Sequence, residues 1–485
     1  MSGEIFKLGK ESLIYGLSTV LARLLNFVLM PFYTHYLLPS EYGIIAAVFS
    51  YIAFFNIIYG YGLNQGYMRY YRREKSLASS FAAVFYTSLL LSILIAFFSP
   101  SLAKLSGIGE YNNKLIIYAS IILALDAFTL IPFADLRIYH KAKRFVFVRT
   151  VSIVINVILN IIFLAYLRMG VEGVFWANII SSAVSVFLLG SYFKYLFEKI
   201  DFKLLKEISS YSLPFLPAGL SIMVVQVIDR PILLKLADPS SAGIYQANYR
   251  LAIIMSMLVT MFDQAWRPFV IERSENPSSS SLFSKVFTYF TFLSLSVWLF
   301  FSLFMEDIVS FEIYGKPIVA YAYHSGLFIV PIIMGAYFFN GIYINFLAPV
   351  IISKKTKPVM FAAIAGAAAN LALNFAFIPS YGIKAAAWSA LISYLLMTFS
   401  LRFLTRKDYE INYDYMKFFA MIFIALLSYF IYLYFYQKAA SCSLPALKAL
   451  LIVLYPPLCY AAGCFSKEEI KSFSSFLRDR FSRKY

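Results

Sequence analysis

Long apolar stretches recur along this chain at a length that suits the crossing of a lipid bilayer. A helix needs about 20 mainly apolar residues to span roughly 30 Å of hydrocarbon. Windows of that length predict fourteen helices, at residues 11–36, 42–66, 77–99, 115–136, 145–167, 172–192, 208–234, 242–266, 283–305, 318–347, 358–378, 385–401, 418–436 and 449–465. Barrel strands would be half as long and would alternate in polarity. We therefore expect an all-α integral membrane protein.

The polar connections between these windows alternate in charge. Counted from the N-terminus, alternate connections hold 31 of the 42 Lys and Arg residues, and the other connections hold eight. Because Lys and Arg accumulate on the cytoplasmic side of a membrane, this predicts a multi-pass protein of the plasma or inner membrane with both termini in the cytoplasm. An even number of spans follows.

Composition agrees with a lipid environment. Of the 485 residues, 61% are hydrophobic and only 14% are charged, whereas a soluble domain carries about 25% charged residues. The net charge of +17 is divided among short clusters between apolar runs. That distribution argues against a nucleic-acid-binding surface, which needs a basic patch on a soluble face.

The chain also repeats itself at an offset of 200 to 214 residues. The segment PSEYGI at 39–44 matches PSSAGI at 239–244, and GVEGVFWA at 170–177 matches GIKAAAWS at 382–389. Two asparagine pairs match in the same order, Asn156 with Asn160 and Asn370 with Asn374. Because the repeated unit holds six spans, an even number, both copies have the same orientation, related by a pseudo-twofold axis along the membrane normal.

This duplication predicts the domain organisation. We expect an N-terminal six-helix lobe at 1–200 and a C-terminal six-helix lobe at 201–407. Two additional transmembrane helices follow in 408–465. The tail at 466–485 places apolar residues on one helical face among basic ones, which predicts an amphipathic cytoplasmic helix.

Very few charged residues lie inside the predicted spans. The ones that we single out are three arginines and three aspartates: Arg23, Arg230, Arg250, Asp126, Asp229 and Asp263. Each charge at the membrane centre costs about 2.5–3.5 kcal/mol, so each needs partners or water.

Two interpretations of these charges stay open. In the first they form structural ion pairs, for example Arg23 with Asp126 and Asp229 with Arg250. Asp229 is not expected to neutralise Arg230, because adjacent residues on a helix point about 100° apart. In the second, the arginines face a hydrated cavity and bind an anionic group, for which the guanidinium fork is suited.

Other polar residues inside or near the spans allow similar alternatives. Asp263 and Arg267 lie one helical turn apart and form either an intrahelical pair or a gate. The asparagine pairs form interhelical hydrogen bonds or contact sugar hydroxyls. We assign no role to the three dispersed histidines, and neither they nor the three cysteines have the spacing of a metal site. These residues are His35, His140, His324, Cys442, Cys459 and Cys464.

Three segments give the chain a resemblance to a known family: LARLLNFVLMPFYTHYLLPSEYGIIAAVFSY from residue 21, DLRIYHKAKRFVFV from 135, and MFDQAWRPFV from 261. It resembles the polysaccharide transporters, or lipid-linked (O-antigen-type) oligosaccharide flippases, of the MATE-like MOP exporter superfamily. The resemblance implies two lobes that alternate in access around a cationic central cavity. It also implies a polyprenyl-pyrophosphate-linked glycan as substrate, moved from the cytoplasmic to the outer leaflet during cell-surface polysaccharide synthesis. Arg23, Arg230 and Arg250 would then bind the pyrophosphate.

Alternatives remain. The chain lacks a nucleotide-binding loop and its connections are short, so we expect a transporter and not an enzyme, without a cofactor. An ion-coupled multidrug or cation antiporter of the same superfamily is the alternative function, and coupling to protons or Na⁺ stays open, with Asp126 as a candidate. Expected partners are the glycan substrate, membrane lipid, and a polysaccharide polymerase or glycosyltransferases, but no nucleic acid.

Overall fold

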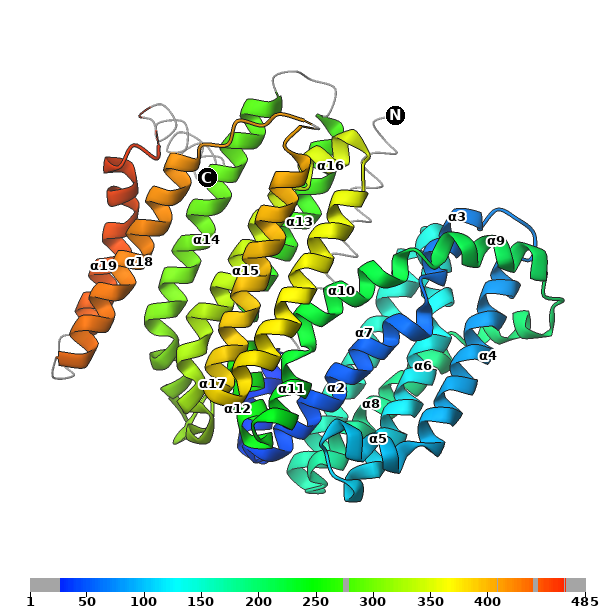
Figure 1. Ribbon diagram of the computed structural model, residues 1–485. Helices are drawn as coiled ribbons and strands as arrows, with labels where there is room; N and C mark the ends of the chain where they lie inside the picture. Colours follow the sequence, from blue (N-terminus) through cyan, green and yellow to red (C-terminus); the bar gives the residue numbers. More distant parts are fainter. Residues whose placement is uncertain (1–26, 274–278, 408, 439–443, 466, 468–485) are drawn as a thin grey trace, which may run out of the picture.

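The computed structural model describes residues 27–273, 279–407, 409–438, 444–465 and 467, and these are almost entirely helical (Figure 1). In the first part of the chain, residues 27–36 are helical and are followed by α2 (Pro39–Gly60), α3 (Leu63–Tyr70), α4 (Ser76–Phe97), α5 (Ser99–Ser106), α6 (Asn113–Ile138), α7 (Ala142–Ile161), α8 (Gly170–Leu188) and α9 (Phe202–Ser212). Short η1 (Glu110–Asn112), η2 (Ile162–Tyr166) and η3 (Gly190–Phe197) lie between them.

The second part of the chain continues in the same way. It contains α10 (Phe215–Val227), α11 (Asp229–Leu236), α12 (Pro239–Leu251), α13 (Ile253–Glu272), α14 (Ser279–Ser310), η4 (Tyr321–Ile329), α15 (Val330–Asn345), α16 (Ala348–Ser353), α17 (Lys357–Thr405), α18 (Tyr415–Lys438) and α19 (Leu444–Ala461). A two-stranded antiparallel hairpin, β1 (Glu312–Ile313) and β2 (Lys316–Pro317), follows α14. The all-α membrane fold is therefore confirmed. Arg23 and nearly all of the predicted tail lie outside the described residues.

Judged by length and composition, the described helices provide fewer membrane spans than the fourteen that the sequence predicts. Ten described helices are long and apolar enough to cross a membrane, or eleven if the bent pair α9 and α10 is one span. The 49-residue α17 accounts for part of the difference, since it bends at Gly382 and covers two predicted spans. The predicted eighth span is divided into α12 and α13. The total of fourteen stays a prediction.

The helices form two groups that meet at one end. Figure 1 shows α2 to α9 on one side and α13 to α19 on the other, with the groups diverging toward the end that carries α3, α9 and α16. At the opposite end, α2 of the first group packs extensively against α12, and α11 packs on both. We call this the closed end. The predicted domain boundaries themselves stay a prediction.

The closed end is built from the repeated segments of the sequence. Both α2 and α12 begin with a proline at their first turn, where a missing N–H costs nothing. The Glu41 carboxylate accepts the Leu38 N–H at 2.8 Å, and the Asp238 carboxylate accepts the Ser241 N–H at 2.8 Å. Each helix start thus has its free backbone donors partly satisfied, as helix termini require.

Two equivalent glycines allow these helix starts to touch. A Cβ atom added to Gly43 would overlap the carbonyl oxygen of Pro239, and one added to Gly243 would overlap that of Pro39. Because the same position of each repeat contacts the same position of the other, the contact is twofold symmetric, as in an isologous interface. Only glycine permits so close an approach of two helix backbones.

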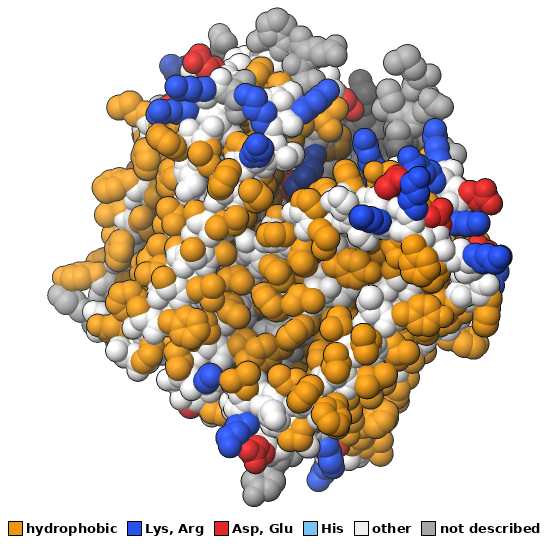
Figure 2. Space-filling model, turned by 45° about the vertical axis from the view of Figure 1, so that its right-hand side comes forward, with side chains coloured by type: hydrophobic (Ala, Val, Ile, Leu, Met, Phe, Trp, Pro, Cys, Tyr) orange, Lys and Arg blue, Asp and Glu red, His pale blue; other side chains and the backbone are white. Residues whose placement is uncertain are grey.

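The surface agrees with a position in lipid. Figure 2 shows a broad hydrophobic belt, with Lys, Arg, Asp and Glu side chains gathered above and below it. Large apolar side chains such as Phe187, Phe197 and Met416 are more than 80% exposed. An exposed surface of this kind marks contact with membrane.

The glycine contact can be tested by adding a methyl group. We expect Gly43→Ala and Gly243→Ala each to lower the free energy of unfolding by about 1–3 kcal/mol, the usual cost of overpacking, and to lower the Tm in detergent. Gly190→Ala is the control, because an added Cβ there meets nothing within 4 Å. If both crossing variants keep the Tm of the control, the contact is not a tight one.

Candidate functional site

The charged site of the second group starts at a break between two helices. α10 ends at Val227, Ile228 separates it from α11, and Asp229 opens α11. The Asp229 carboxylate turns back on its own helix start and accepts the Arg230 N–H at 3.0 Å. The same oxygen lies 2.7 Å from the Arg230 guanidinium.

This pairing corrects one of our expectations. Neighbouring residues within a continuous helix point apart, which made an Asp229–Arg250 pair the expected one. The helix break frees Asp229 from that geometry, so it pairs with Arg230 instead. The side chains are only 2% and 5% exposed, so both charges are removed from solvent together.

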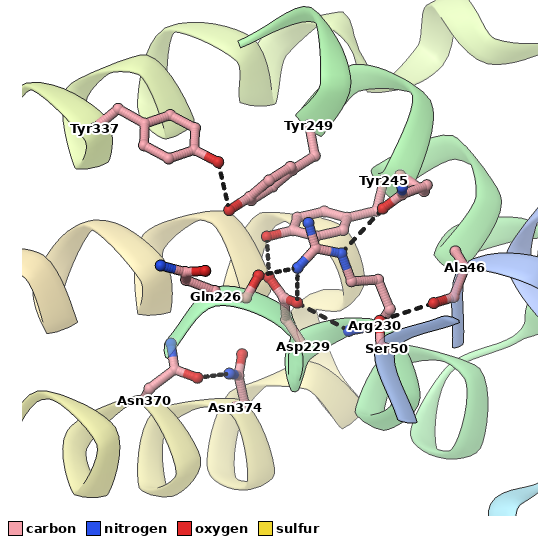
Figure 3. Close-up of polar contacts among 11 residues, drawn as sticks. Ala46, Ser50, Gln226, Asp229, Arg230, Tyr245, Tyr249, Tyr337, Asn370 and Asn374 are labelled. Atoms are coloured by element: carbon pink, nitrogen blue, oxygen red, sulfur yellow. Dashed lines mark hydrogen bonds and ion pairs between the residues drawn. The ribbon is translucent and has the colours of Figure 1, made fainter. Parts of the chain in front are cut away.

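Polar and aromatic groups complete the surroundings of Arg230 (Figure 3). Its Nε donates to Gln246 Oε1 at 3.0 Å, and its Nη1 donates to the backbone carbonyl of Gln226. The guanidinium carbon lies 3.8 Å from the ring centroid of Tyr249, a close cation–π contact. The Tyr245 hydroxyl donates to the second oxygen of Asp229. Thus Arg230 is held by its partners and does not face a hydrated cavity in this conformation.

Arg250 occupies a different environment, between the two helix groups. It lies in the last turn of α12, half-buried, with its guanidinium carbon 6.0 Å from the ring centroid of Tyr33. The Tyr33 hydroxyl donates to Asn160 Oδ1 at 2.9 Å. Arg250 therefore contacts the first group, whereas Arg230 is held by residues of α10, α11 and α12.

The two asparagine pairs are not equally satisfied. In the first group, Asn160 donates to Asn156 Oδ1 at 3.1 Å and accepts the Tyr33 hydroxyl. In the second group, Asn374 donates to Asn370 Oδ1 at 2.9 Å, but Asn370 Nδ2 and Asn374 Oδ1 have no hydrogen-bond partner. Both of these residues are at most 1% exposed. Buried polar atoms without a partner are uncommon in folded proteins, and a functional role is one explanation for them.

The remaining predicted charges lie apart from Arg230. Asp126 on α6 accepts the Ser182 hydroxyl of α8 at 2.8 Å, which ties two helices of the first group together. Asp263 and Arg267 form an intrahelical pair at 2.7 Å, with side chains 25% and 55% exposed. Arg23 is outside the described residues. The roles assigned to all seven charged residues stay predictions.

Sequence patterns missed part of this site. The tyrosines around Arg230 come from α12 and α15, and Tyr337 donates to Tyr249 at 2.8 Å. Their only signal in the sequence was the high total of 38 tyrosines, which also suits a membrane interface. The arrangement can hold the Arg230 guanidinium without water. It can also release this guanidinium to an anion that competes with Asp229 for it.

The chain is similar to proteins of known family and structure. The model of a family described as polysaccharide biosynthesis protein matches residues 8–273, more than half of the chain. Among solved structures, the chain is similar to the lipid II flippase MurJ in an inward closed conformation, with a TM-score of 0.71 and 16% identity over 93% of this chain and 99% of that one. No curated protein sequence matches the chain.

Two further structures show the same fold in different conformations. An inward-facing structure of a multidrug resistance MATE family transporter of the MOP superfamily gives a TM-score of 0.63 at 15% identity, over 80% of this chain and 95% of that one. An outward-facing structure of such a transporter gives 0.53 at 15% identity, over 82% and 94%. Identities this low establish a shared fold alone.

The buried pair can be tested by removing one partner or both. We expect Asp229→Ala to lower the free energy of unfolding by about 3–5 kcal/mol, because it leaves a buried guanidinium without its counter-charge. The double variant Asp229→Ala/Arg230→Met should recover most of that loss in thermal unfolding. Asp263→Ala, at a more exposed pair, should cost no more than about 1 kcal/mol. Additive losses in the double variant would contradict the pairing.

Proposed function

Because the chain belongs to the family of polysaccharide biosynthesis proteins, we propose that it is a flippase for a polyprenyl-pyrophosphate-linked oligosaccharide. It moves this substrate from the cytoplasmic to the outer leaflet by alternating access, for the synthesis of cell-surface polysaccharide. The family match and the transporter fold support this proposal. The observation on which it mainly rests is the closed end, where the two helix groups meet.

The closed end supplies one of the two states that alternating access requires. α2 and α12 touch at Gly43 and Gly243, while the groups diverge toward the other end (Figure 1). The connection at this end between the first two spans carries no Lys or Arg, whereas connections at the opposite end are basic. By the positive-inside rule the closed end faces outward in the plasma or inner membrane. In this conformation the side away from the cytoplasm is therefore closed.

The arginines fit the pyrophosphate of such a substrate. A guanidinium binds phosphate oxygens in a bidentate fork. Arg250, between the two groups, makes the first contact, and Arg230 follows when the anion displaces Asp229. Tyr245 and Tyr249 lie beside this path and can stack on or hydrogen-bond a sugar. Arg23 completes the predicted set.

An ion-coupled multidrug or cation antiporter is the second candidate function. It is favoured by the fold shared with a MATE family transporter and by Asp126, a buried carboxylate in the middle of α6 that accepts the Ser182 hydroxyl and lies near Arg149. For the flippase, the same residue provides a site for proton or Na⁺ coupling. A polysaccharide polymerase or glycosyltransferases would act on the substrate before or after flipping.

Transport itself can be measured in proteoliposomes with a short polyprenyl-pyrophosphate oligosaccharide. We expect Arg250→Ala to reduce the flipping rate at least about tenfold, since a hydrogen bond to a charged group contributes about 1.5–3 kcal/mol. Arg250→Lys should recover only part of it, because lysine lacks the fork. Arg73→Ala is the matched control: that guanidinium is exposed and pairs with Glu207 at 2.7 Å. Movement of a cationic dye in place of the glycan lipid would favour the antiporter.

Ion coupling is tested by Asp126→Asn. The amide keeps an oxygen that accepts the Ser182 hydroxyl but cannot lose a proton or balance Na⁺. We expect the variant to flip substrate down its gradient while losing any acceleration by a proton or Na⁺ gradient. Asp263→Asn should keep the acceleration. If Asp126→Asn keeps it too, coupling lies elsewhere.

A further inference from the structure

Two of the three histidines hold the same short segment at the closed end. His35 Nε2 lies 2.8 Å from the carbonyl oxygen of Pro317, and His324 Nε2 lies 2.8 Å from the carbonyl oxygen of Val319. In sequence these histidines are far apart, which is why the sequence analysis gave them no role. A carbonyl oxygen can only accept, so each Nε2 carries a proton and donates it.

The segment held by the histidines connects the two helix groups. It belongs to the second group and runs from the last residue of β2 into the start of η4. It crosses the end of the helix at 27–36, which belongs to the first group. There the Ala320 N–H donates to Thr34 Oγ1 at 3.3 Å, and the Tyr323 hydroxyl donates to the Leu37 carbonyl at 2.9 Å. We call residues 317–323 the strap.

The repeat gives the first group a matching contact. His35 and Lys235 occupy the same position, four residues before Pro39 and Pro239. The connection after α4 reaches Lys235, where a Cβ added to Gly107 would lie 3.5 Å from the Lys235 Cα. Both outer connections thus reach the equivalent residue of the opposite copy. Of these two residue types, only histidine has its ordinary titration range between pH 5 and 8.

We propose that His35 forms a proton-sensitive latch that holds the two lobes together at the outer end, on a strap that His324 braces within its own lobe. This inference rests on the orientation given under the proposed function. A protonated imidazole donates a charge-assisted hydrogen bond, which is roughly twice as strong as a neutral one. The His35 bond joins the two groups, so it exists only while the strap lies on the first group. Low pH outside therefore favours the closed end, and this stabilisation is lost as pH rises through the range where histidine titrates.

The charged groups around the latch are few. In the hairpin, Glu312 pairs with Pro317 in the strand register and Lys316 precedes it. The Tyr321 hydroxyl donates to Glu312 at 3.3 Å, and the Tyr321 ring lies 5.0 Å from that of His324. On the side of the first group, Glu41 accepts the Leu38 N–H. The groups named around the latch thus carry two negative charges, on Glu312 and Glu41, and one positive charge, on Lys316.

The experiment measures the distance between the lobes at the outer end as a function of pH. Spin labels are placed at Leu105→Cys and Phe311→Cys, both more than 60% exposed, in a chain whose three native cysteines are replaced, reconstituted in nanodiscs without substrate. Pulsed electron–electron double resonance should show the ratio of closed to open populations rising about three- to fivefold between pH 8 and pH 5.5.

Glutamine separates titration from structure, because its Nε2 can donate to the same carbonyl without changing charge. His35→Gln should abolish the pH response, whereas His324→Gln, whose bond lies within one lobe, should keep most of it. His140→Asn is the matched control, since Asn tolerates the left-handed backbone there (φ 54), and it should respond like the parent. A parent without a pH response, or a His35→Gln variant that retains one, would overturn the latch.

The outcome is independent of the transport assay. A pH response of the lobes without glycan flipping would leave the latch in place and reject the substrate. Flipping without a pH response of the lobes would reject the latch and leave the proposed function.

Discussion

A guanidinium surrounded by hydrocarbon cannot rely on water, and this constraint organises the centre of the second helix group. Every donor of Arg230 needs a protein acceptor, because an unpaired polar group at that depth costs several kcal/mol. The break at Ile228 supplies two acceptors at once, the Gln226 carbonyl and the repositioned Asp229 carboxylate. Tyr249 covers the guanidinium face. The irregular backbone is thus the condition for burying the charge, and Pro231, which lacks an N–H, suits the first turn after it.

The closed end follows a different physical rule, close approach between two backbones. Gly43 and Gly243 let the helix starts touch without side chains between them, and van der Waals packing of this kind joins helices in membranes where the hydrophobic effect does not. Because such a contact is non-polar and uncharged, it can separate without exposing an unpaired donor. The hydrogen bonds of the strap add the directional part of the closure. The two kinds of contact together give an end that is well defined when shut and not costly to open.

Sequence reasoning succeeded where a pattern has a long period and failed where contacts are local. Apolar length predicted the helical membrane fold, and the repeat at residues 39 and 239 predicted a duplication, but not that the two helix starts meet. The pairing of Asp229 with Arg230 was missed because it depends on a one-residue helix break at Ile228 that no propensity signals. The strap was missed because His35 contacts Pro317, 282 residues away, only through the fold. The domain boundaries and the total of fourteen spans remain predictions, since α17 joins two spans in one bent helix and the first span is only partly described.

The two sites are joined by one short rigid element. α11 has eight residues, with Arg230 near its start and Lys235 near its end, so about 7 Å of helix separates them. Lys235 lies next to Gly107, in the connection between α4 and α6, and α11 also packs on α2 and α12. An opening of the closed end that moves Lys235 would therefore tilt α11 and move Arg230 relative to its partners. A ligand shifts such an equilibrium only by binding one state better than the other. An anion that accepts Arg230 in place of Asp229 does this, because it stabilises the arrangement in which the buried pair is already broken.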